Sequence, residues 1–104
     1  MSQPYALVGL ARPKPERAAE LRELLLSFVE PTRAEEGCLQ YHFHADKEDP
    51  SVFAFYEVWR SGEDLDRHLE LPRMRAFWES RMDYLTEDLE IRRLDMLSPY
   101  GTAP

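Results

Sequence analysis

The chain has 104 residues, a length that suits one domain able to bury roughly two-thirds of its unfolded surface. Twenty Asp and Glu against thirteen Lys and Arg give a formal net charge of −7, which argues against nucleic acid or an anionic membrane as partner, because both need a basic surface. A single cysteine, Cys38, rules out an intrachain disulfide or a zinc-binding cysteine cluster. No apolar run approaches the ~20 residues of a membrane-spanning helix, so we expect a soluble protein of the reducing cytoplasm.

The first third of the chain predicts a strand followed by a helix. Tyr5–Ala11 is rich in apolar residues and is stopped by prolines. Pro15 suits the first turn of a helix, and from Ala18 to Val29 the apolar residues recur at steps of three and four. Pro31 should kink or end this helix, with a last turn before Gly37.

The middle of the chain predicts a β-hairpin. Cys38–Asp46 reads as a strand with one apolar face, formed by Leu39, Tyr41, Phe43 and Ala45. After a turn that contains Pro50, Val52–Trp59 returns as an antiparallel strand. This third strand is apolar on both faces, since Phe55, Glu57 and Trp59 alternate with Tyr56 and Val58. Both faces of the third strand must therefore be covered.

The last third predicts two helices and a strand. Ser61 or Gly62 begins a short helix whose inward stripe is Leu65, His68 and Leu69. Pro72 starts the next helix, with a stripe formed by Met74, Phe77, Trp78, Arg81, Met82 and Leu85. Glu87–Leu97 reads as a final strand, in which the alternation slips near Arg92 and Arg93 and indicates a bulge.

The order strand, helix, strand, strand, helix, strand predicts an α+β, ferredoxin-like fold with a four-stranded antiparallel sheet. We expect the domain to span residues 1–97 and residues 98–104 to form a C-terminal tail. The helices would cover one face of the sheet. The other face would expose an apolar patch with two or three aromatic rings from the third strand, too large to leave in water. A second copy packed sheet against sheet would cover it, so we expect a homodimer.

His68 is the leading candidate for chemistry, because it faces the sheet and its near-neutral pKa suits a base that takes a proton from a phenol or enol. A partly buried histidine bonded to a backbone carbonyl is an equally good interpretation. Glu57 could orient or charge-balance His68 in one cavity, or it could belong to an ion pair between subunits.

A set of large side chains is expected to lie mostly in the core, but together they could wall a pocket for a flat aromatic molecule: Trp59, Trp78, Phe77, Met74, Met82, Tyr41 and Phe43. Arg81 lies on the apolar stripe of its helix, where it either extends to the surface or meets an anion. His42 and His44 have the spacing of metal ligands on one strand face but lack a third ligand nearby. We therefore expect no metal site.

Two segments carry a resemblance to a known family: PTRAEEGCLQY at residues 31–41 and FYEVWRSGEDLDRHLELPRMRAF at residues 55–77. Their EEGC turn, E-x-W-x-S strand end and L-x-x-H-L helix resemble the antibiotic biosynthesis monooxygenase (ABM) domain family, including its quinol monooxygenases. The resemblance extends from Tyr5 to about Leu97. It implies a dimeric α+β barrel with one pocket in each subunit, between the sheet and the helices that follow the third strand.

The resemblance also implies an activity. Members oxidise polycyclic phenols or hydroquinones to quinones with O2 and use no metal, flavin or haem. On this resemblance His68, Trp59 and Glu57 are the family's histidine, tryptophan and glutamate. Two alternatives remain: a dimer that binds a small aromatic or lipophilic molecule without turnover, and a haem-degrading enzyme. Haem breakdown ranks lower, because Trp78 takes the place of the histidine that haem-degrading members use as iron ligand.

Overall fold

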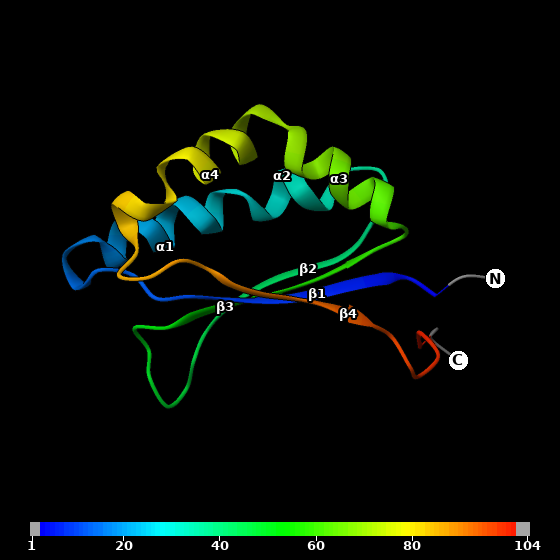
Figure 1. Ribbon diagram of the computed structural model, residues 1–104, viewed down its shortest axis with the longest axis horizontal. Helices are drawn as coiled ribbons and strands as arrows, with labels where there is room; N and C mark the ends of the chain where they lie inside the picture. The colour runs from blue at the N-terminus through cyan, green and yellow to red at the C-terminus, as the bar shows by residue number, and fades with distance from the viewer. Residues whose placement is uncertain (1–2, 102–104) are drawn as a thin grey trace.

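A computed structural model describes residues 3–101, so the expected domain of residues 1–97 and tail of residues 98–104 each extend beyond the described part. The strands and helices, in chain order, are β1 (Tyr5–Ala11), the 3-10 turn η1 (Pro15–Arg17), α1 (Ala18–Ser27), α2 (Val29–Arg33), β2 (Cys38–Ala45), β3 (Phe53–Trp59), α3 (Gly62–Glu70), α4 (Pro72–Tyr84) and β4 (Glu90–Asp95). The strands form one antiparallel sheet in the order β2-β3-β1-β4. Figure 1 shows every helix on one face of it. The expected α+β ferredoxin-like fold is confirmed.

The first helix breaks one turn earlier than the position of its proline suggests. α1 ends at Ser27, Phe28 joins the two helices, and Pro31 is the third residue of α2. A proline ring clashes with the carbonyl four residues before it, which here belongs to Ser27. The expected break at Pro31 is therefore displaced to Phe28. Within residues 3–101, no helix is long and apolar enough to cross a bilayer.

The bulge predicted in the last strand lies instead in the second strand. β4 pairs with β1 without a register shift, whereas β2 shifts between Cys38 and Gln40. Leu39 is 43% exposed as a result, and Cys38 packs against the core in its place. The change of phase near Arg93 arises because β4 has apolar residues on both faces, with Leu94 on the face away from the helices.

The aromatic side chains of β3 lie mainly on the helix side of the sheet. Phe53 and Trp59 are buried in two core clusters beneath the helices, and Phe55 packs against the second of these clusters. Tyr56 alternates with them and lies on the opposite face. The expectation of two or three aromatic rings from β3 on that opposite face is therefore wrong. That face instead carries smaller apolar residues: Ala6, Val8, Leu10, Ala54, Val58 and Leu94.

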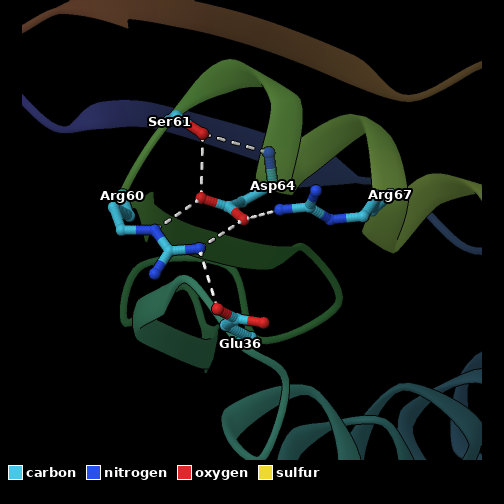
Figure 2. Close-up of polar contacts among 5 residues, drawn as sticks. All are labelled: Glu36, Arg60, Ser61, Asp64 and Arg67. Atoms are coloured by element: carbon cyan, nitrogen blue, oxygen red, sulfur yellow. Dashed lines mark hydrogen bonds and ion pairs between the residues drawn. The ribbon is translucent and has the colours of Figure 1, made fainter.

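A polar corner anchors the start of α3 (Figure 2). Asp64 is only 2% exposed and accepts hydrogen bonds from the Arg60 guanidinium at 3.0 Å and from Ser61 Oγ at 2.8 Å. Arg67 forms an ion pair with the same carboxylate. These donors, led by Arg60, hold the pKa of Asp64 well below its usual range. Ser61 also caps α3, because its Oγ accepts from the backbone N–H of Asp64.

The same corner contacts the turn that ends α2. The Arg60 side chain reaches Glu36 at 3.4 Å, and its backbone N–H donates to the carbonyl of Gly37 at 2.7 Å. Gly37 has a φ of 89°, and a Cβ added to it would lie 2.3 Å from Cγ of Asp64. Both its backbone conformation and its contact with Asp64 therefore require glycine.

We expect Gly37→Ala to lower the free energy of unfolding by about 1–3 kcal/mol, because alanine meets left-handed strain and a clash with Asp64. Gly62→Ala is the matched control: its Cβ would meet only the Tyr5 ring at 3.4 Å, so stability should be unchanged or up to about 1 kcal/mol higher. Urea unfolding of the two variants measures the difference. Equal effects would contradict the close packing of Gly37 on Asp64.

Candidate functional site

An apolar cavity lies between the sheet and the helices, with a volume of about 60 Å³ measured as space for the centres of water molecules. Most of its wall is hydrocarbon or aromatic, and its polar side chains are Tyr41, Glu57, His68 and Arg93. The apolar lining residues are Leu7, Leu25, Phe28, Phe43, Phe55, Leu65, Leu69, Met74, Phe77, Trp78, Leu89 and Ile91. Few polar groups in a hydrocarbon wall are typical of a small-molecule site.

His68 has one nitrogen bonded and one nitrogen bare. Its Nδ1 lies 2.8 Å from a carboxylate oxygen of Glu35, in the turn after α2. Because a carboxylate can only accept, Nδ1 carries the proton and Nε2 keeps its lone pair. Nε2 is fully buried and has no hydrogen-bond partner within residues 3–101. The side chain is 1% exposed and is one of the residues that line the cavity.

The surroundings of His68 keep it neutral and hold its ring in place. Burial lowers its pKa below the ordinary 6.5, an effect that outweighs the opposing pull of Glu35. Its ring lies 4.8 Å from the Trp59 ring and 6.0 Å from the Tyr41 ring, measured between centroids. Arg73 pairs with Glu35 from the far side and donates to Thr32 at 3.1 Å. The result is a positioned imidazole able to accept a proton.

Glu57 is a second buried acid in the cavity wall. Its side chain points to the same side of β3 as that of Trp59, two residues on, and accepts a hydrogen bond from the indole Nε1 at 2.9 Å. Glu57 is 5% exposed, and burial raises its pKa to about 7 despite that bond and the nearby Arg93. A large fraction is therefore protonated at neutral pH. Glu57 thus forms its hydrogen bond with Trp59, whereas the carboxylate that is hydrogen-bonded to His68 belongs to Glu35.

The structure places most of the residues expected at a pocket in the wall of the cavity. Two of them, Trp59 and Arg81, do not line it. Five of the aromatic and methionine side chains expected there line the cavity: Tyr41, Phe43, Met74, Phe77 and Trp78. Trp59 is fully buried and lies behind the wall, against His68 and Glu57. Arg81 lies away from the cavity, where it pairs with Asp88 at 2.8 Å and stacks on Trp78. Met82, expected on the inward stripe of α4, is 43% exposed.

Two site residues escaped sequence reasoning. Glu35 belongs to the EEGC turn, where nothing local distinguishes it from Glu36. Its partner His68 is 33 positions further along the chain. Arg93 lies where the sequence pattern, slipping near Arg92 and Arg93, predicts a bulge. Regular alternation through β4 places it on the cavity side next to Leu7.

The candidate metal and thiol residues lie outside the cavity. His42 and His44 are exposed on β2, with ring centroids 6.3 Å apart. Within residues 3–101, no three His, Cys, Asp or Glu side chains come together as a metal-binding group. Cys38 packs against the core, and burial raises the pKa of its thiol to about 11. Cys38 is therefore a packing residue.

Glu57→Gln should change how stability depends on pH. The pKa of Glu57 is about 7 in the fold against an ordinary 4.5, so the folded wild type loses stability as pH rises from about 4.5 through 7. Glutamine keeps an acceptor for Trp59 without the charge. Between pH 5 and 8 the variant should therefore gain up to about 3 kcal/mol on wild type in denaturant unfolding. Glu79→Gln, on the exposed surface of α4, is the control, and a gain independent of pH would contradict the buried acid.

Comparison with known proteins places the chain in a family. The sequence profile of the antibiotic biosynthesis monooxygenases matches residues 4–80. The chain is 35% identical over 91 residues to the Mycobacterium tuberculosis protein named "Putative monooxygenase Rv0793", covering 88% of this chain and 89% of that protein. It is 36% identical over 89 residues to the Synechocystis protein sll1783; this match covers 86% of the chain but 60% of the cyanobacterial protein.

Solved structures agree with the sequence comparison. The crystal structure of PA3566 from Pseudomonas aeruginosa has a TM-score of 0.86 at 34% identity and covers 94% of this chain and 98% of its own. The structure of Rv0793 has a TM-score of 0.85 at 27% identity, with 98% and 100% covered. Because the profile match covers residues 4–80, well over half of the chain, the chain belongs to the antibiotic biosynthesis monooxygenase family.

Proposed function

We propose that the protein is a cofactor-independent monooxygenase that oxidises a phenolic, polycyclic aromatic or quinol substrate with O2. The observation that carries the proposal is the bare Nε2 of His68, fully buried in the wall of an apolar cavity. A buried acceptor without a partner costs the fold about 1–3 kcal/mol, which a bound hydroxyl group would recover. Membership of a monooxygenase family supports the same chemistry.

The residues support a simple reaction sequence. His68 Nε2 takes the proton of the bound hydroxyl, and Glu35 stabilises the resulting imidazolium through Nδ1–H. The phenolate is then electron-rich enough to reduce O2 directly. One oxygen atom replaces a ring hydrogen and becomes the new carbonyl, the other leaves as water, and the substrate supplies all four electrons. The apolar wall keeps water away from the reactive intermediates.

Glu57 and the aromatic wall have supporting roles in this proposal. Glu57, with a pKa near 7, can give or take a proton close to the reacting ring. Trp59 holds the Glu57 carboxyl and contacts the His68 ring, so it acts as a positioning residue for both groups. Tyr41, Phe43, Phe77 and Trp78 shape the cavity for a flat molecule.

His68→Gln tests the function. Oxygen uptake is measured with a panel of naphthols, anthrones and hydroquinones, and we expect kcat/KM for the best substrate to fall by about 10²–10⁴-fold in the variant. Glutamine keeps polarity and much of the volume but is not a base. His44→Gln, an exposed histidine on β2, should retain wild-type activity.

The outcomes separate the alternatives. Absence of oxygen uptake by wild type across the panel would overturn the proposal, as would full activity in His68→Gln. Absent uptake together with ligand-induced quenching of tryptophan fluorescence would favour a binding protein for a small aromatic or lipophilic molecule. Absent uptake together with a shifted Soret band on adding haem would favour haem breakdown.

The proposed active form is a homodimer joined through the outer faces of two sheets. Smaller apolar side chains such as Val8, Leu10 and Leu94 lie on that face, and Leu94 is 39% exposed. The segment after β4 turns under the same face, where Gln40 donates to the Tyr100 hydroxyl at 3.2 Å (Figure 1). We expect sedimentation equilibrium to give twice the chain mass of 12.3 kDa. A stable mass of one chain would contradict the dimer.

A further inference from the structure

Arg93 stands apart from the other arginines in its pairing. Within residues 3–101, every arginine except Arg22 and Arg93 forms an ion pair with a carboxylate. Arg22 lies exposed on α1. Arg93 lines the main cavity, and its one side-chain hydrogen bond there goes to the Tyr5 hydroxyl at 3.3 Å. In a chain with a net charge of −7, an arginine that lacks an acid partner and lines a cavity is unusual.

The sheet register defines where this guanidinium lies relative to the other polar groups. Tyr41 pairs with Glu57, Glu57 with Leu7, and Leu7 with Arg93, so the four residues form one row across the strands, from β2 to β4. All four line the cavity. His68 contacts the Tyr41 end of the row. Strands lie about 4.8 Å apart, so Arg93 lies about 14 Å along the floor from Tyr41.

Arg93 also marks the open side of the cavity. It is the exposed member of the lining residues, whereas Tyr41, Glu57 and His68 are buried. The charge of Arg93 lowers the pKa of Glu57 against the effect of burial, but the two residues are separated by β1 and form no ion pair. The carboxyl of Glu57 is already engaged by Trp59. Apart from its hydrogen bond to the Tyr5 hydroxyl, the guanidinium therefore has donors left to meet a ligand at the exposed side of the cavity.

We propose that Arg93 binds an acidic group on the substrate, so that the substrate is an elongated hydroxylated aromatic acid. This inference rests on the proposed function: the hydroxyl lies inside at His68 Nε2, and the carboxylate lies outside at Arg93. Arginine suits this role because its planar fork binds a carboxylate through two parallel hydrogen bonds. Arg93 is then a specificity-determining residue and takes no part in the oxidation.

The test compares two probes that differ only in charge, 6-hydroxy-2-naphthoate and its amide, 6-hydroxy-2-naphthamide. Both carry a hydroxyl and the second group at opposite ends of a bicyclic ring. Calorimetric titration without oxygen measures binding alone. We expect wild type to bind the acid about tenfold more tightly than the amide, and Arg93→Gln to abolish this preference while leaving amide binding unchanged. Arg93→Lys, which keeps the charge but loses the fork, should restore part of it.

Arg92→Gln is the matched control. Arg92 is the neighbouring residue on β4, on the opposite face of the sheet, where it pairs with Glu90 at 3.8 Å. It should keep the wild-type preference at the same net charge as Arg93→Gln. Equal affinity of wild type for the two probes, or an unchanged preference in Arg93→Gln, would overturn the proposal. Because oxygen is absent, these outcomes are independent of whether the protein catalyses an oxidation.

Discussion

The hydrogen bond between Glu35 and His68 is the interaction on which the candidate site depends. At 2.8 Å it determines which nitrogen of the imidazole carries the proton, and so which one is left buried as an acceptor without a partner. An imidazole lacking this bond could present N–H to the cavity and would then be a donor instead of a base. The same carboxylate can stabilise the charge that appears once His68 takes a proton. One contact thus sets the orientation of the proposed base and raises its pKa against the larger, lowering effect of burial.

Several parts of the fold hold the two partners of this bond in place. Glu35 lies in the short turn between α2 and β2, and His68 lies one turn along α3 from Asp64. The Asp64 corner joins these segments, because it caps α3 through Ser61 and packs directly on Gly37. Arg73, from α4, pairs with Glu35 from a third direction. The Asp64 network and the Glu35–His68 pair are therefore parts of one arrangement.

Sequence reasoning predicted the fold well, because its signals are local. Alternation on β3 placed Glu57 and Trp59 on one face, and that spacing also makes their hydrogen bond possible. Helical spacing predicted that His68 faces the sheet, and its side chain is buried in the structure. Errors arose where tertiary contacts compete with local pattern: β2 shifts its register so that Cys38 packs inward and Leu39 turns out. Glu35 could not be selected over Glu36, since only the arrival of α3 from a distant part of the chain distinguishes them.

Burial keeps two of the polar groups in the cavity largely uncharged. His68 is kept neutral by burial, and the same effect keeps Glu57 partly protonated, so two titratable groups of opposite kind are both uncharged at neutral pH to a large extent. The guanidinium of Arg93 is exposed and lines the same cavity. A cavity that is neutral inside and cationic at its rim favours ligands with the reverse pattern, an apolar hydroxylated body and an acidic end.

The most direct test of this account is the protonation state of His68 itself. Nitrogen-15 NMR of labelled imidazoles distinguishes the two tautomers, and the exposed His42 and His44 provide references in the same sample. At pH 7.5 we expect His68 to carry its proton on Nδ1 and to have a bare Nε2, with a pKa below the ordinary 6.5. A proton on Nε2, or a pKa of His68 that is not lowered from the ordinary value, would contradict this.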